Sequence, residues 1–364
     1  MIPKNAKIIS KDNYPFDKRI CGLYPLERLI NVLYKIGVRT IYFELSDEEK
    51  LFVTGKVLKK LKRLKDLKII YEKGKEGKLK CFKLYTNLFS QHQLFDDLNS
   101  YFRKKDNFLI PKTDDKQFYI KDNKDIKIAR HILKRRILDS TPGFFAREVN
   151  KRVSLPISSI LSSTGIHPNA VTLFNMLLGV LCAFLVYLNT YTTIALGGIL
   201  FQIISVVDGV DGEVAVLTFK TSSFGALLDT ISDLFSLGIF LVACSFVFFD
   251  HFQGISTYIV IGILVIGVIL TVLAEWMFLR KYDGPVSLRT YWTEFLEKLP
   301  KDDKLVAFSL SIKYFVKKEF YSFLFLFACV SGIAHWIIPG AATFVAISSF
   351  LLLTLNFRFL SIFK

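Results

Sequence analysis

The sequence has few cysteines and few histidines, five of each among 364 residues. Three of the cysteines lie in apolar runs, and none forms a CxxC pair. We therefore expect reduced, packed thiols, and the spacing excludes both a zinc-ribbon type of site and a disulfide framework. No local spacing suggests a Ser-His-Asp or Cys-His catalytic arrangement. The cysteines are Cys21, Cys81, Cys182, Cys244 and Cys329.

The second part of the chain lacks charge. Residues 151–364 hold 14 Lys and Arg against 13 Asp and Glu, whereas residues 1–150 hold 34 against 19. The chain combines a mean hydropathy of +0.38 with 22% charged residues because the charged residues and the apolar residues lie in different parts of the sequence. Six apolar stretches approach the roughly 20 residues that a spanning helix needs, which excludes a single soluble core. They are Pro168–Thr190, Tyr191–Val207 (continuing to Phe219), Leu234–Phe249 (beginning near Thr221), Ser256–Ala274, Tyr321–Ile338 and Gly340–Phe357.

The loops between these stretches predict the orientation. The turns Leu188–Thr192, Asp250–Thr257 and Ile338–Gly340 contain no Lys or Arg. Basic residues gather on the other side, so both termini are expected in the cytoplasm. The N-terminal sequence lacks the apolar core of a cleavable signal peptide.

Residues 139–166 are predicted to form a juxtamembrane helix in the membrane interface. Apolar residues recur at helical spacing over Thr141–Thr164, with Arg147, Lys151 and Arg152 between them. Pro156 predicts a break or a second start. An ordinary linker helix is the alternative.

Residues 1–138 predict a cytoplasmic α/β domain with a mainly parallel sheet. No Gly-rich phosphate loop is present, and Lys73–Lys80 is typical of a solvated turn. No nucleic-acid-binding signature accompanies the basic charge, which suits anionic lipid headgroups better. The expected strands are Ala6–Ser10, Arg39–Glu44, Lys68–Glu72, Lys80–Leu84 and Asn107–Ile110, and the expected helices are Leu26–Ile36, Asp47–Leu67 and Gln91–Arg103.

Four aspartates carry the chemistry. Asp208 and Asp211 share one helix face, Asp229 and Asp233 share another, and Lys220 marks the turn between the helices. Each intramembrane charge costs at least about 2.5 kcal/mol, and no matching basic partners are evident. Oxygen ligands suit hard divalent cations, and a pair of such ions can clamp a diphosphate. An ion-pair or helix-packing role is the alternative.

The pattern D-x2-D-G-x2-A-x9-G-x3-D-x3-D resembles the signature of the CDP-alcohol phosphotransferase (CDP-alcohol phosphatidyltransferase) family, over roughly residues 141–360. The resemblance implies a six-helix membrane domain that transfers a phosphoalcohol from a CDP-alcohol to a hydroxyl and releases CMP. It implies that Asp208, Asp211, Asp229 and Asp233 bind two Mg²⁺ ions, with Mn²⁺ as a substitute. It also implies that Asp233 is the general base, and that the enzyme is a homodimer.

The resemblance extends to the donor site. His167–Thr172 (HPNAVT) is similar to the family's entry to the first span, where Asn169 and Thr172 face the donor; helix start and N-cap roles are the alternative. The small residues Gly212, Ala215 and Gly225 make room for the nucleotide, and Ser222 falls where the family often has a ligand-contacting hydroxyl. Val216 departs from the family, which usually has Arg there.

Gly143–Thr172 and Asp211–Leu217 look most like the branch of di-myo-inositol-phosphate-phosphate synthases. That branch often carries an N-terminal cytidylyltransferase domain, which Gly22–Gly37 resembles loosely, and the missing substrate loop predicts that this domain is inactive. The resemblance implies CDP-inositol, or a CDP-diacylglycerol or archaeal ether type, as donor. It leaves the acceptor open, with an inositol phosphate as the candidate. Arg147, Lys151, Arg152, Lys220 and Arg280 are candidates for binding that acceptor. A divalent-cation transporter and a silent membrane scaffold are the competing hypotheses.

Overall fold

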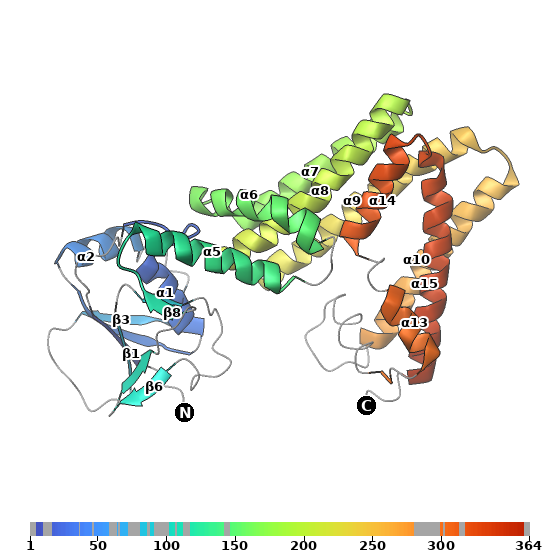
Figure 1. Ribbon diagram of the computed structural model, residues 1–364. Helices are drawn as coiled ribbons and strands as arrows, with labels where there is room; N and C mark the ends of the chain where they lie inside the picture. Colours follow the sequence, from blue (N-terminus) through green and yellow to red (C-terminus); the bar gives the residue numbers. More distant parts are fainter. Residues whose placement is uncertain are drawn as a thin grey trace. The chain divides into compact units, whose positions relative to one another are not determined.

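The structure is a computed structural model that divides into two compact units (Figure 1). We call residues Met1–Pro142, Leu155–Pro168 and Gly212–Thr221 the α/β unit, and residues Gly143–Ser154, Asn169–Asp211 and Ser222–Lys364 the helical unit. The described residues are 5–9, 17–35, 37–45, 47–57, 64, 66–71, 81–85, 88–90, 102–105, 108–111, 117–141, 146–279, 299–300, 303–312 and 317–359.

The α/β unit contains a six-stranded sheet in the order β3-β2-β1-β4-β7-β6. The first five strands of this order run parallel, as predicted, and β6 pairs antiparallel with β7. Strands β5 and β8 form a separate, two-stranded antiparallel sheet. The strands are β1 (Asn5–Ile9), β2 (Thr40–Glu44), β3 (Lys68–Tyr71), β4 (Cys81–Tyr85), β5 (Leu88–Ser90), β6 (Phe102–Lys105), β7 (Phe108–Pro111) and β8 (Gln117–Tyr119).

Helix α1 (Pro25–Lys35) covers the first two strands. Its apolar residues recur every three or four positions, so one face packs on β1 and β2. The core includes Leu29, Ile30, Ile8 and Phe43, all almost fully buried. The other described helices of the N-terminal part are α2 (Asp47–Phe52), a π-helical turn (Val53–Val57) and α5 (Asn123–Asp139).

Two predictions for this part need correction. The helix expected over Gln91–Arg103 is wrong at its end, because Phe102–Lys105 forms β6 and pairs with β7. The helix expected over Asp47–Leu67 gives way at Val53 to the π-helical turn. The end of that predicted helix is also wrong, because Leu64, Asp66 and Leu67 are not helical. Residues 58–63, 65, 72–80 and 91–101 lie outside the described residues, so these parts of the two helices and the turn at Lys73–Lys80 stay predictions.

The juxtamembrane segment is a π-helical turn (Ala146–Asn150) followed by α6 (Lys151–Thr164). The break predicted at Pro156 is wrong, since α6 continues through it. Pro156 lies on the exposed side of α6, where the carbonyl that loses its hydrogen bond stays accessible.

Among the described residues, five helices are long and apolar enough to cross a membrane. Each follows one predicted stretch, while the sixth stretch, Tyr321–Ile338, does not form one continuous helix. There α14 (Lys318–Val330) ends before Gly332, at φ +75°, and a 3-10 turn (Ala334–Trp336) leads into the last helix. The remaining helices are α7 (Pro168–Tyr187), α8 (Tyr191–Leu217), α9 (Ser223–His251), α10 (Ile255–Leu279), α13 (Lys304–Ile312) and α15 (Ile337–Phe359).

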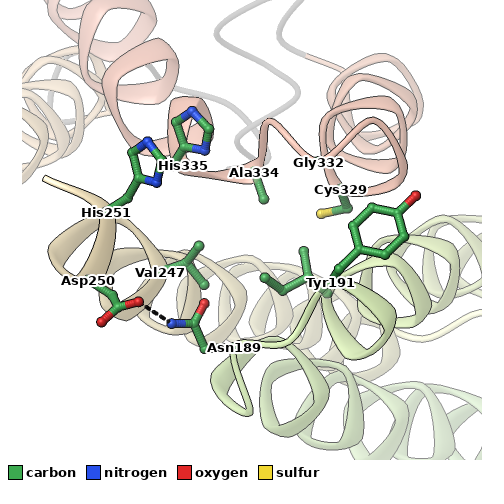
Figure 2. A pocket seen from close by; sticks show the side chains of 10 residues that line it. Asn189, Tyr191, Val247, Asp250, His251, Cys329, Gly332, Ala334 and His335 are labelled. Atoms are coloured by element: carbon green, nitrogen blue, oxygen red, sulfur yellow. Dashed lines mark hydrogen bonds between the residues drawn. The ribbon is translucent and has the colours of Figure 1, made fainter.

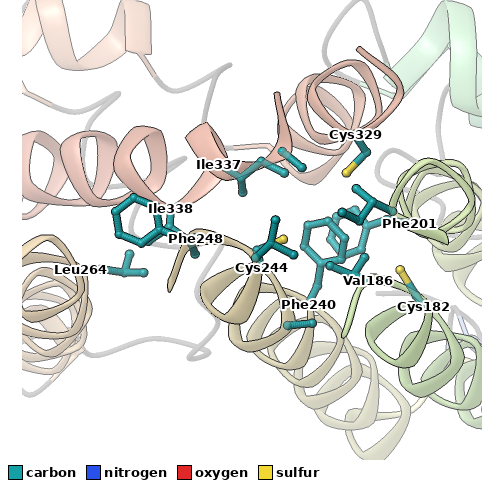
Figure 3. Close-up of a cluster of buried hydrophobic side chains, with 14 of the residues drawn as sticks. Cys182, Val186, Phe201, Phe240, Cys244, Phe248, Leu264, Cys329, Ile337 and Ile338 are labelled. Atoms are coloured by element: carbon teal, nitrogen blue, oxygen red, sulfur yellow. The ribbon is translucent and has the colours of Figure 1, made fainter. Parts of the chain in front are cut away.

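An apolar cluster joins α7, α8, α9, α10, α14 and α15 (Figure 3). At its centre the rings of Phe201 and Phe240 stack with centroids 4.3 Å apart, and Phe325 packs on both. Cys182, Cys244 and Cys329 are buried free thiols in this cluster, and Cys21 is a buried free thiol in the α/β unit, as expected. The cluster holds the helices that carry the aspartates.

Gly22 makes a close contact with the end of α6, inside the α/β unit. Its φ is +84°, and a Cβ built there would lie 2.0 Å from the carbonyl oxygen of Ser162. Gly37 has a similar φ of +99°, but a Cβ there would meet no atom within 4 Å. A substitution at Gly37 therefore causes backbone strain alone, whereas one at Gly22 causes both backbone strain and steric overlap.

We expect Gly37→Ala to lower the free energy of unfolding by about 1–2 kcal/mol, the cost of a left-handed backbone. Gly22→Ala should lower it further, because the methyl group also displaces the Ser162 carbonyl. Thermal unfolding of the detergent-solubilised variants measures both. Equal melting temperatures would contradict the contact with α6.

Candidate active site

Two helix ends bring the aspartates together. Asp208 and Asp211 lie in the last three turns of α8, and Asp229 and Asp233 in the first three turns of α9. Helix α9 begins at Ser222, whose hydroxyl accepts a hydrogen bond from the Gly225 amide at 3.0 Å. A Ser N-cap of this kind satisfies an otherwise unpaired amide of the first turn.

Three of the four carboxylates gather in one place. Asp208, Asp229 and Asp233 each offer a carboxylate oxygen, and these oxygens all lie within 4.8 Å of one another. All three residues are partly buried. An oxygen-only donor set at this spacing fits a hard divalent cation such as Mg²⁺ or Mn²⁺.

Lys318 is the cation that sequence reasoning missed. Its ammonium nitrogen, on the first residue of α14, lies 2.9 Å from an Asp208 oxygen and also pairs with Asp233. Only 10% of its side chain is exposed. The expectation that the aspartates have no basic partner is therefore wrong for two of them. The sequence did offer one signal for Lys318: it lies just before an apolar stretch, at the end where charged residues gather.

Asp211 takes a different partner. Its carboxylate accepts a hydrogen bond from the Thr172 hydroxyl of α7, and both residues are buried. The two residues were predicted for different roles, one for metal and one for the donor. The structure links them directly, so the start of α7 orients an acid of the motif.

Three predicted donor residues also lie together. A Cβ built on Gly225 would lie 3.1 Å from the Ser222 hydroxyl and 3.3 Å from the Asn169 side-chain oxygen. Gly212 is exposed, with nothing within 4 Å of a Cβ built on it, and Ala215 is half-buried. Small residues therefore stand where the motif has them, with room beside Gly212.

Two of the predicted acceptor residues share one acidic partner. Arg147 and Arg152 both pair with Glu148, at 3.2 Å for Arg147. The hydrogen bond from Arg152, helped by Arg147, lowers the pKa of Glu148. Lys151 is half-buried at the start of α6, and Lys220 follows α8 with its amide bonded to the Ala215 carbonyl. Arg280 lies outside the described residues.

A separate pocket of about 210 Å³ lies at the far end of α9 (Figure 2). Asp250 accepts a hydrogen bond from Asn189 there, and the rings of His251 and His335 stack 3.8 Å apart. Asp250 is 17 residues after Asp233 in α9, which is about 25 Å along the axis. The pocket therefore has no part in the aspartate group.

Comparison with known proteins identifies the helical part. The family model described as CDP-alcohol phosphatidyltransferase matches residues 165–347, just over half of the chain. A protein of Thermococcus kodakarensis named bifunctional IPC transferase and DIPP synthase is 37% identical over 123 residues, which are 34% of this chain and 27% of the relative. Its namesake in Aquifex aeolicus is 39% identical over 117 residues, covering 32% and 26%.

An archaetidylinositol phosphate synthase of Pyrococcus horikoshii is 33% identical over 92 residues, which are 24% of this chain and 47% of the relative. The chain spans about a quarter of the length of the bifunctional relatives it matches. The family match covers all four aspartates, the donor residues and Lys318. By this match the chain belongs to the CDP-alcohol phosphatidyltransferase family.

Proposed function

We propose that this protein is an integral membrane CDP-alcohol phosphotransferase that depends on Mg²⁺. An acceptor hydroxyl attacks the β-phosphorus of a CDP-alcohol, a new phosphate–oxygen bond forms, and the bond to CMP breaks. The observation that carries the proposal is the gathering of Asp208, Asp229 and Asp233 within a motif of family spacing.

The four aspartates are proposed to hold two divalent cations, Mg²⁺ or in its place Mn²⁺. When bound, such ions neutralise the diphosphate and polarise the attacked phosphorus. The Thr172 hydroxyl donates a hydrogen bond to one carboxylate oxygen of Asp211. A hydrogen-bonded carboxylate of this kind is fixed in orientation, which favours a defined coordination geometry.

Asp233 is the proposed general base. It lies last in the motif and is the most exposed of the two acids that Lys318 pairs with, at 35% against 21% for Asp208. A partly exposed carboxylate can reach the acceptor hydroxyl and take its proton as the new bond forms. The proton leaves the acceptor and the electron pair of the broken bond leaves with CMP.

The donor is proposed to lie against Gly212, Ala215 and Gly225, with Asn169, Thr172 and Ser222 supplying hydrogen bonds. The close group of Asn169, Ser222 and Gly225 supports this. Gly225 keeps the space between two polar side chains open. The absence of a side chain at Gly212 leaves a surface that a nucleotide can approach.

One relative's name and the resemblance to a synthase branch support the choice of substrates. The Pyrococcus horikoshii relative is named archaetidylinositol phosphate synthase, and the sequence resembles the branch of di-myo-inositol-phosphate-phosphate synthases. We propose CDP-inositol or a CDP-lipid of the diacylglycerol or archaeol type as donor and an inositol phosphate as acceptor. The acceptor phosphate would be bound by cationic side chains on the cytoplasmic side, namely Arg147, Lys151, Arg152, Lys220 and Arg280.

The membrane arrangement is also a proposal. We infer six spans, with α14 as the fifth, both termini in the cytoplasm, residues 139–166 in the interface, and a homodimer. The five apolar helices support it. The N-terminal part is proposed to be a Rossmann-like, nucleotidyltransferase-like domain that has lost its activity. The order of its parallel strands supports that kinship.

Asp233→Asn should lower the rate of CMP release at least about 100-fold, because an amide cannot take the proton from the acceptor hydroxyl. Asp250→Asn is the matched control, since it removes an acid from the other end of the same helix. CMP release is measured from purified protein with Mg²⁺, using CDP-inositol and CDP-diacylglycerol, each with and without inositol phosphate. Asp250→Asn should keep wild-type turnover.

Full turnover in Asp233→Asn would contradict the assignment of the base. No CMP from wild-type protein with either donor would contradict the proposed reaction. Divalent-cation flux through wild-type liposomes in that case would favour the transporter hypothesis, and no flux would favour a silent scaffold. A donor requirement for CDP-inositol rather than the lipid would identify a soluble-solute synthase.

Lys318→Met should tighten Mn²⁺ binding to the protein. The ammonium group pairs with two of the carboxylates, so it competes electrostatically with a divalent cation. Lys317→Met is the control, because it removes the same charge one residue away. Isothermal titration with Mn²⁺ measures the affinity. Weaker binding in Lys318→Met than in Lys317→Met would contradict the competition.

A further inference from the structure

Two arginines of one short segment reach the ends of two helices within the α/β unit. Arg19 donates from Nη1 to the carbonyl oxygen of Ser163, 2.9 Å away, in the last turn of α6. Arg28 donates from Nη2 to the carbonyl oxygen of Leu217, 2.7 Å away, at the last residue of α8. Helix C-termini present unpaired carbonyls and partial negative charge, which guanidinium groups satisfy.

Arg28 is built into this position. It is 2% exposed and also donates to the Ile20 carbonyl at 3.1 Å. Burial lowers its pKa to about 10, so the side chain remains charged at neutral pH. Cys21 and Gly22 adopt left-handed backbone conformations just after Ile20, so the loop that supplies this carbonyl is held in a restricted conformation.

Phe219, two positions after Leu217, also contacts Arg28. Phe219 has a φ of +55°, unusual for an aromatic residue, and ends α8 in the left-handed region. Arg28 lies 5.3 Å and Lys35 5.2 Å from the centre of its ring. Leu23 and Val32 enclose the same ring in a small apolar cluster. Side chains of α1 therefore contact the segment that ends α8 around one aromatic ring.

Leu217 itself is buried in another cluster. It packs with Ile20, Ile126, Ala129 and Leu133, which come from the loop before α1 and from α5. Asp211 precedes Leu217 by six residues in the same helix, about 9 Å along the axis. Val216, where the family usually has arginine, lies directly before the capped residue.

We propose that Arg28 is a positioning residue for the phosphotransfer site, and that it acts through the last turn of α8 on the aspartates of that helix. The inference rests on the proposed function. It gives the N-terminal domain a role that needs no nucleotide chemistry of its own. The domain supplies, from a separate part of the chain, a guanidinium group that bonds to the backbone of the residue directly after Val216.

The test compares Arg28→Met with Arg39→Met. Arg39 is the matched control, because its guanidinium also donates to two backbone carbonyls, those of Tyr34 and Val38, and also lies over an aromatic ring. All of these partners belong to the N-terminal domain itself. Arg28→Lys is the conservative variant, which keeps the charge but loses the forked pair of donors.

Three quantities are measured on full-length protein in detergent: melting temperature, kcat and KM for CMP release, and Mn²⁺ affinity. Arg28→Met should lower kcat by about tenfold or more and weaken Mn²⁺ binding by a similar factor, as loss of an outer support does at metal sites. The donor KM should change less than kcat. Arg39→Met should lower the melting temperature with kcat within about twofold of wild type.

Arg28→Lys should fall between wild type and Arg28→Met in kcat and Mn²⁺ affinity. If Arg28→Met does not fold, the comparison of Arg28→Lys with wild type tests the positioning role instead. Equal kcat and Mn²⁺ affinity in wild type and Arg28→Lys would then overturn the inference. So would a folded Arg28→Met with the kinetics of Arg39→Met. Inactive wild-type protein that still binds Mn²⁺ more tightly than Arg28→Met would reject the proposed reaction but keep the positioning role.

Discussion

Carboxylates at the ends of apolar helices need a cation or a hydrogen-bond donor beside them, because an uncompensated ion near lipid is costly. The helical unit meets this constraint in two ways. Lys318 pairs with Asp208 and Asp233, and the Thr172 hydroxyl holds Asp211. The three gathered carboxylates form an oxygen-only group that suits divalent cations. The stacked aromatic core holds the helices that carry this group.

Helix α8 connects that site with the α/β unit. Its last turn belongs to the α/β unit and its aspartates to the helical unit. Arg28, Phe219 and Leu217 fix the C-terminal end through hydrogen bonds, ring contacts and burial. A basic domain without a phosphate loop therefore has a physical reason to remain attached to a membrane enzyme.

Sequence reasoning succeeded where period and local spacing carry the information. The parallel strands, the long apolar helices and the aspartate pairs at i,i+3 and i,i+4 all follow from such patterns. It failed where distant segments meet. Lys318 lies 85 residues after Asp233, and Arg28 lies 189 residues before Leu217, so no local pattern reveals either pair. It also failed at Phe102–Lys105, where pairing with β7 overrides helical periodicity.

The central claim is that the motif holds a pair of divalent cations for phosphotransfer. The most direct test is electron paramagnetic resonance of Mn²⁺ bound to the purified protein in the presence of CDP. The account predicts two Mn²⁺ ions per chain with a spin-coupled spectrum, because the ions of two-metal sites lie about 3.5–4 Å apart. A single magnetically isolated ion, or none, would contradict it.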